Sequence, residues 1–205
     1  MGHIIAVSGP IGSGKTTLAG GIAAVLGNAS ILHYDSYERA SRQAPNDVIR
    51  WISEGADFNA FVLPDLVSDL SALKRGISIT DPLSGETTRA EDYIIFEMPL
   101  GREHRHTSPL IDLLVWIDIP PDVALARKMR EYTEGFLTGG HGRHGLEWLK
   151  RYLDTYPAMI RPIMEILHER VRPGADIIID GRDDPRTQAD RAAKEITRLL
   201  GSDRH

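Results

Sequence analysis

Short apolar runs alternate along the chain with segments in which apolar residues recur at helical spacing. Each run is rich in isoleucine, valine or aromatic residues and is bounded by glycine, proline or polar residues, as expected of strands buried on both faces of a parallel sheet. The runs that predict strands are residues 3–8, 30–35, 93–98, 113–119 and 176–180.

The intervening segments predict helices. In one of them Leu66, Leu70 and Leu73 fall on a single face. The predicted helices are residues 15–26, 64–75, 121–134, 145–171 and 185–200. Pro157 and Pro162 should kink or break the fourth of these helices. The alternation of strands and helices favours an α/β fold, with a doubly wound, mainly parallel five-stranded sheet flanked by helices.

A glycine-rich segment, residues 136–145, lies between two of the predicted helices. We interpret residues 121–150 as a helical lid in which this segment is the mobile loop, because glycine's backbone freedom suits a hinge. An ordinary surface loop is the alternative. No repeat divides the chain, and 205 residues suit one hydrophobic core, so we expect a single domain over residues 1–205.

Composition narrows the class of protein. A formal net charge of -5 disfavours nucleic-acid binding, and the absence of cysteine excludes thiol catalysis and cysteine-ligated metals. No apolar run approaches the roughly 20 residues that cross a bilayer, and no signal peptide is visible. We therefore expect a cytoplasmic protein that acts on a small molecule, without a membrane partner; association into a homo-oligomer stays open.

Residues 9–17 read GPIGSGKTT and match the P-loop, or Walker A, pattern G-x-x-x-x-G-K-[ST]. They lie between a predicted strand and a predicted helix, where backbone N–H groups and a helix N-terminus can face one phosphate. The motif predicts ATP binding, with Lys15 neutralising the β- and γ-phosphates and the Thr16 hydroxyl binding Mg²⁺. The expected ATP-binding residues are Gly9, Pro10, Ile11, Gly12, Ser13, Gly14, Lys15, Thr16 and Thr17.

The rest of the chain restricts what is done with the phosphate. A switch GTPase should carry an Asn-Lys-x-Asp guanine reader, and a motor ATPase usually needs an apolar run ending in Asp-Glu; the sequence has neither. Phosphoryl transfer to a small molecule is the favoured reaction. A regulatory nucleotide-binding protein without an acceptor is the alternative from another class.

Two carboxylates fall at predicted strand ends. The carboxyl ends of parallel strands line the ligand crevice, so Asp35 can serve as the general base that accepts the proton of an attacking hydroxyl. Glu97 can hold a water of the Mg²⁺ shell. The alternative for Asp35 is a helix N-cap or a surface carboxylate, and the alternative for Glu97 is a capping carboxylate or one at the rim of the crevice.

The P-loop followed by HYDSYER at residues 33–39 resembles the uridine kinase family, in the group that includes phosphoribulokinase and pantothenate kinase. YIIFEMPL (93–100), PDVALARKMRE (121–131) and ADIIIDG (175–181) extend the resemblance over most of residues 3–183. It implies an ATP- and Mg²⁺-dependent kinase acting on a nucleoside hydroxyl, with Glu97 at the family's acidic position. It also implies that Tyr37 and Asp57 orient the acceptor and that Arg127 and Arg130 are lid arginines.

Arg127 and Arg130 share a helix face because they are three residues apart. We expect Arg127 to act in catalysis and in substrate binding, and Arg130 to bind ATP; a solvated basic face is the alternative. Arg102, in a basic cluster after Glu97, could receive an anionic acceptor or belong to a solvated loop.

Three segments depart from the family pattern. Met98 replaces the glycine that follows the acidic residue, residues 79–91 are short, and the lid carries the glycine- and histidine-rich stretch in place of Glu-Arg-Gly-Arg. These segments select the acceptor. A sugar or pantothenate-type kinase is therefore the alternative within enzymes.

Overall fold

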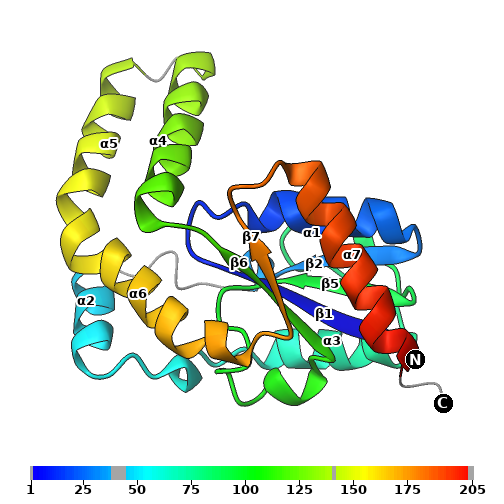
Figure 1. The fold of residues 1–205 in the computed structure, drawn as a ribbon. Coiled ribbons are helices and arrows are strands. Elements are labelled where there is room, and N and C mark those ends of the chain that lie inside the picture. The colour runs from blue at the N-terminus through cyan, green and yellow to red at the C-terminus, as the bar shows by residue number, and fades with distance from the viewer. Residues whose placement is uncertain (1, 38–44, 140–141, 203–205) are drawn as a thin grey trace.

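A computed structural model describes residues 2–37, 45–139 and 142–202. Its centre is a parallel sheet in the order β2-β5-β1-β6-β7 (Figure 1). The strands are β1 (His3–Ser8), β2 (Ala29–His33), β5 (Tyr93–Glu97), β6 (Leu113–Asp118) and β7 (Ile177–Asp180). All five lie where the apolar runs predict them, within two residues at each end.

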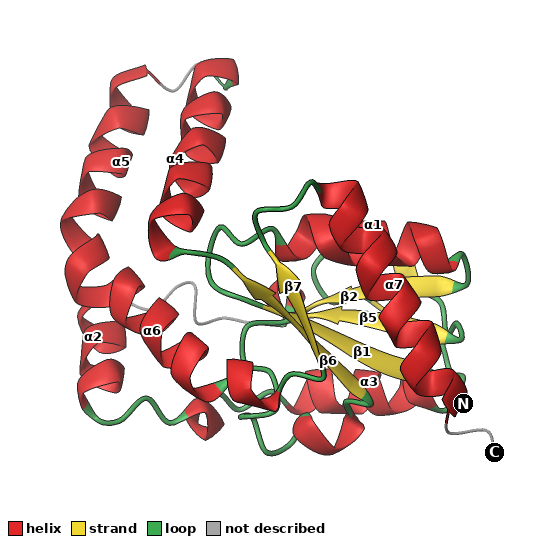
Figure 2. Cartoon of the chain, viewed as in Figure 1, coloured by secondary structure: helices red, strands yellow, loops and turns green. Residues whose placement is uncertain are grey.

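Helices cover both faces of the sheet (Figure 2). The helices are α1 (Lys15–Leu26), α2 (Pro45–Ser53), α3 (Pro64–Lys74), α4 (Pro121–Thr138), α5 (Gly142–Thr155), α6 (Arg161–Arg170) and α7 (Pro185–Ser202). Apolar side chains of α1 and α7 form one core with Ile5, Val7 and Ile117 of the sheet. On the opposite face, α3 and α6 pack against Ile4 and Trp116. The doubly wound architecture predicted from the sequence is thereby confirmed.

Two elements were not predicted. Helix α2 occupies residues 45–53, and a small antiparallel hairpin joins β3 (Ile79–Thr80) to β4 (Thr87–Thr88). The predicted strand at residues 30–35 ends at His33, because Tyr34–Ser36 forms a 3-10 turn. The predicted helix at residues 145–171 is divided as expected, with a π-helical segment, Tyr156–Ile160, between α5 and α6.

The glycine-rich segment is not the ten-residue loop expected from its composition. Helix α4 continues to Thr138 and α5 begins at Gly142, so both ends of the segment are helical. The helices stay together because aromatic rings pack between them: the ring centroid of Tyr132 in α4 lies 4.4 Å from that of Trp148 and 5.5 Å from that of Tyr152 in α5. This packing stabilises helical structure at both ends of the segment, although its glycine content predicts a loop.

The α4–α5 hairpin projects beyond the sheet layers (Figure 1). Within the described ranges, no helix combines the length and the apolar character needed to cross a membrane.

Candidate active site

The P-loop connects β1 to α1 at the carboxyl edge of the sheet. Gly12 has a φ of 79°, and a Cβ atom there would lie 2.3 Å from the carbonyl oxygen of Ala124 in α4. Gly14, with a φ of 96°, caps the N-terminus of α1. Glycine is therefore required for the first turn of α4 to pack directly on the phosphate loop.

Lys15 extends from the first turn of α1 back over the loop. Its ammonium donates hydrogen bonds to the carbonyl oxygens of Gly9, at 3.1 Å, and Pro10, at 3.2 Å. Burial lowers the pKa of Lys15, and the carboxylates of Glu97 and Asp35 oppose that shift. The loop thus holds a desolvated cation, which interacts strongly with an anion that enters the loop.

Thr16 and Glu97 meet beside the lysine. The Thr16 hydroxyl donates to Glu97 Oε1 at 2.9 Å, and His33 Nδ1 lies 2.6 Å from Glu97 Oε2. His33 and Glu97 are register partners at the ends of β2 and β5. Burial raises the pKa of Glu97, but hydrogen bonds from His33 and Thr16 outweigh it and hold the pKa below its usual value. Glu97 is therefore an anion.

This pair of oxygen ligands fits a magnesium ion. Mg²⁺ prefers oxygen donors, and in nucleotide sites it keeps waters and substrate phosphates as most of its ligands. Over the described ranges, no three His, Asp or Glu side chains form a cluster that could hold a metal by themselves. Thr16 and Glu97 suit an ion that arrives with the nucleotide.

A cavity of about 600 Å³ opens over these residues. Asp35, in the 3-10 turn after β2, lines it together with the P-loop, Thr16 and Glu97. The other walls are formed by Tyr34, Met98, Pro99, Lys128, Glu131, Ile163 and Leu167. The structure thus brings the predicted base, phosphate loop and metal ligands into one cavity.

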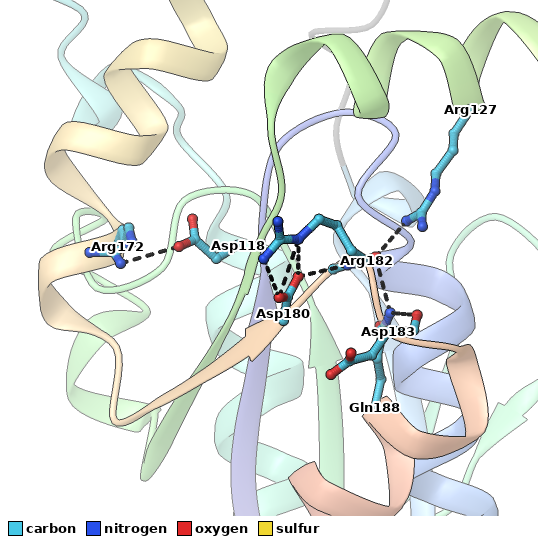
Figure 3. A network of polar contacts seen from close by, with 8 residues as sticks. Asp118, Arg127, Arg172, Asp180, Arg182, Asp183 and Gln188 are labelled. Atoms are coloured by element: carbon cyan, nitrogen blue, oxygen red, sulfur yellow. Dashed lines mark hydrogen bonds and ion pairs between the residues drawn. The ribbon is translucent and has the colours of Figure 1, made fainter.

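The lid arginines line a neighbouring cavity of about 460 Å³, which they share with Gly12, Ser13, Gly14 and Thr17. Arg127 Nη1 donates to the carbonyl oxygen of Gly181 at 2.8 Å, and Gln188 holds the same turn through Gly181 and Asp183 (Figure 3). Arg130 is exposed and lies 3.7 Å from Glu134. Asp35 is not among the residues that line this second cavity.

Lys128 of α4 is a candidate site residue that the sequence interpretation missed. It lines the cavity of Asp35 and Lys15, and its ammonium lies 2.8 Å from Glu131 and 4.8 Å from the ring centroid of Tyr132. Its charge also lowers the pKa of Lys15, although less than burial does. Because Lys128 is adjacent to Arg127, only the orientation of α4 reveals which of the two faces the acceptor side.

We expect Lys128→Met to lower kcat/KM about 10- to 100-fold, the cost of one hydrogen bond to a charged group. The methionine keeps the bulk against Tyr132 but cannot neutralise phosphate. Steady-state ADP release measures the change. Lys150→Met, at an exposed lysine of α5 that pairs with Asp154, is the matched control, and a wild-type kcat/KM in Lys128→Met would contradict the assignment of Lys128.

Tyr37 and Asp57 have structural partners. The Tyr37 hydroxyl donates to Asp69 of α3 at 2.7 Å, and burial together with this contact raises the pKa of Tyr37. Asp57 accepts hydrogen bonds from Asn59 and caps the short 3-10 helix Phe58–Ala60. Neither is among the described residues that line the two P-loop cavities. Their role toward an acceptor stays a prediction, and the arginine of the HYDSYER motif lies outside the described residues.

Arg102 does not reach the site. Its guanidinium donates to the carbonyl oxygens of Gly174 and Asp112 and lies 2.8 Å from Asp176. Asp112 and Asp176 precede β6 and β7, so this cluster lies at the amino edge of the sheet, opposite the P-loop. The prediction that Arg102 binds an acceptor is wrong, because the chain has already returned toward the start of the next parallel strand.

A third cavity, of about 730 Å³, lies beyond the start of α4, between α6 and the outer side of β7. Its charged side chains are largely paired with neighbours. Asp180 lies 2.7 Å from Arg182, and Asp118 lies 3.2 Å from Arg172 (Figure 3). Pro10 of the P-loop also lines this cavity, whereas Lys15, Thr16, Asp35 and Glu97 do not.

No protein-family model matches the chain. A uridine kinase from Latilactobacillus sakei is 27% identical to it over 209 aligned positions, which cover 96% of this chain and 94% of that protein. The solved structure of a possible uridine kinase from Bacillus stearothermophilus superposes with a TM-score of 0.53, at 18% identity and over 88% of this chain and 90% of the other. Shikimate kinase from Acinetobacter baumannii superposes with a TM-score of 0.50, at 17% identity and over 100% and 96% of the two chains.

The fold is the one seen in P-loop kinases, and the similarity to a uridine kinase along almost the whole chain supports a P-loop kinase that acts on a small molecule. The resemblance to uridine kinases indicated by the motifs is confirmed by the similarity along almost the whole chain.

Proposed function

We propose that this protein is an ATP- and Mg²⁺-dependent kinase that phosphorylates a hydroxyl group of a nucleoside. The observation that carries the proposal is the single cavity lined by the P-loop, Thr16, Glu97 and Asp35. A phosphate loop alone would suit a nucleotide-binding regulator. A carboxylate across the same cavity supplies the base that transfer to a hydroxyl requires.

The proposed reaction proceeds by positioning and charge neutralisation. The acceptor oxygen attacks the γ-phosphorus while its proton passes to Asp35, and the bond to the β-phosphate oxygen breaks to release ADP. Lys15 and Lys128 neutralise charge on the transferred group from two sides of the cavity. Arg127 and Arg130 act on the nucleotide from the neighbouring cavity.

Magnesium supplies charge neutralisation at the phosphate oxygens when it is bound. Thr16 would bind it directly and Glu97 through a water. Because Glu97 is held as an anion beside the Thr16 hydroxyl, this chain provides two oriented oxygen ligands before the nucleotide enters.

The acceptor side of the cavity is partly apolar. Met98 and Pro99 follow β5, and Ile163 and Leu167 come from α6. Such a wall can pack against a nucleobase while the sugar hydroxyl approaches Asp35. This surface, together with the similarity to the Latilactobacillus uridine kinase, supports a nucleoside over a small charged acid.

A panel of acceptors tests the proposal. ADP release should be measured with ATP and Mg²⁺ in the presence of uridine, cytidine, other nucleosides, simple sugars, pantothenate and shikimate. We expect turnover with one or more nucleosides well above the rate without acceptor. Turnover only with a sugar or pantothenate would show that the acceptor is not a nucleoside. The absence of turnover with every hydroxyl compound would favour a regulatory nucleotide-binding protein.

Residues 121–150 correspond to the α4–α5 hairpin, whose first helix carries Lys128 into the acceptor cavity and Arg127 into the neighbouring one. We propose that this hairpin closes over the bound substrates and excludes water.

A further inference from the structure

His33 contacts Glu97 but has no role in the reaction proposed above. His33 is the last residue of β2, and its Nδ1 lies 2.6 Å from Glu97 Oε2. The His33 side chain is 42% exposed and that of Glu97 is 15% exposed, so the histidine covers the carboxylate from the solvent side.

We propose that His33 is a positioning residue that fixes the Glu97 carboxylate in the orientation required by the metal–nucleotide complex. The inference rests on the proposed function, because it gives Glu97 its role there.

The two carboxylate oxygens of Glu97 have separate partners. Oε1 accepts the Thr16 hydroxyl at 2.9 Å, while Oε2 faces His33. A carboxylate held at both oxygens cannot rotate about its terminal bond without breaking one contact. The histidine therefore determines the plane in which Oε1 meets Thr16, as partners behind a ligand do in metal sites.

The same contact separates Glu97 from the phosphate-binding lysine. The charge of Lys15 acts on Glu97 and lowers the pKa of that carboxyl. Without His33, attraction would draw the carboxylate toward Lys15, and the resulting ion pair would neutralise the cation that the phosphates need. In the structure the Lys15 ammonium instead donates to the carbonyl oxygens of Gly9 and Pro10.

The register of β2 and β5 brings His33 and Glu97 together. His33 and Glu97 are directly paired residues of neighbouring parallel strands, so their Cα atoms are fixed by backbone hydrogen bonds. An ion pair between two exposed loops would contribute little to stability. Here the backbone ordering is already provided by folding, so the side-chain contact is preorganised.

The test measures Mn²⁺ binding to the ADP complex by electron paramagnetic resonance, without turnover. His33→Leu should weaken Mn²⁺ binding about 10- to 100-fold, the usual effect of removing a partner behind a metal ligand. His33→Asn should restore most of the affinity, because the amide nitrogen can occupy the place of Nδ1. His3→Leu, at the opposite end of the sheet, is the matched control and should bind as the wild type does.

A double-mutant cycle shows whether the effect passes through Glu97. In a Glu97→Ala background, which removes both oxygens that meet His33 and Thr16, His33→Leu should cause no further loss of Mn²⁺ affinity. An undiminished loss in that background, wild-type affinity in His33→Leu, or equal losses in the Leu and Asn variants would each overturn the inference. Failure of the wild-type protein to bind ADP with Mn²⁺ would instead contradict the proposed function.

Discussion

Lys15→Ala should reduce the rate of phosphoryl transfer by at least roughly 10²- to 10³-fold, the cost of removing one preorganised donor at a developing charge. Lys15 is a partly buried cation over the phosphate loop, and burial lowers its pKa, so its charge is less screened than that of an exposed lysine. The alanine leaves the loop without that cation. The measurement is ADP release at saturating ATP with the best acceptor from the panel.

The fold should survive this substitution. Lys15 donates only to two carbonyl oxygens of its own loop, and alanine is a favourable residue in a first helical turn. Circular dichroism and the melting temperature should therefore stay close to wild type. Lys150→Ala is the matched control, because Lys150 is exposed on α5 and paired with Asp154. Activity of Lys15→Ala within a few-fold of wild type would contradict the nucleotide site.

The sheet and the P-loop could be predicted because their signals are local. A strand buried on both faces must be almost entirely apolar, and β1, β5 and β6 are. The P-loop is contiguous, so its geometry follows from adjacent residues. Asp35 and Glu97 were placed correctly because parallel strands bring their carboxyl ends to a common edge.

Helix orientation could not be predicted. The spacing of Arg127 and Arg130 shows that they share a face of α4, but it does not show which cavity that face lines. The orientation is fixed by packing of the helix start on Gly12 and of its far end against Trp148 and Tyr152. These contacts are distant in sequence, so Lys128 was overlooked between the two arginines.

Chain proximity also misled the interpretation of Arg102. It follows Glu97 by five residues, yet it belongs to the return segment that must reach the amino edge before β6 can run parallel to β5. Helix α2 and the β3–β4 hairpin were missed for a different reason. Strands of two residues have no period to detect, and α2 is only nine residues long.

Asp35→Asn should lower kcat about 10²- to 10⁴-fold, the usual contribution of a general base, and should leave ATP binding nearly unchanged. Asp35 lines the cavity of Lys15 and Thr16 but comes from the turn after β2 and not from the P-loop. The amide keeps the shape of the side chain and cannot accept the proton of the attacking hydroxyl. The loss should therefore fall on the chemical step.

Two measurements separate a base from a nucleotide ligand at this position. Steady-state kinetics give kcat and the KM for ATP, and calorimetry gives the affinity for ATP with Mg²⁺ in the absence of acceptor. Asp190→Asn, on the exposed side of α7, is the matched control and should behave as wild type does. If Asp35→Asn mainly raised the KM for ATP and weakened binding in calorimetry, the carboxylate would act on the metal or the nucleotide, and the base would have to be sought elsewhere in the cavity.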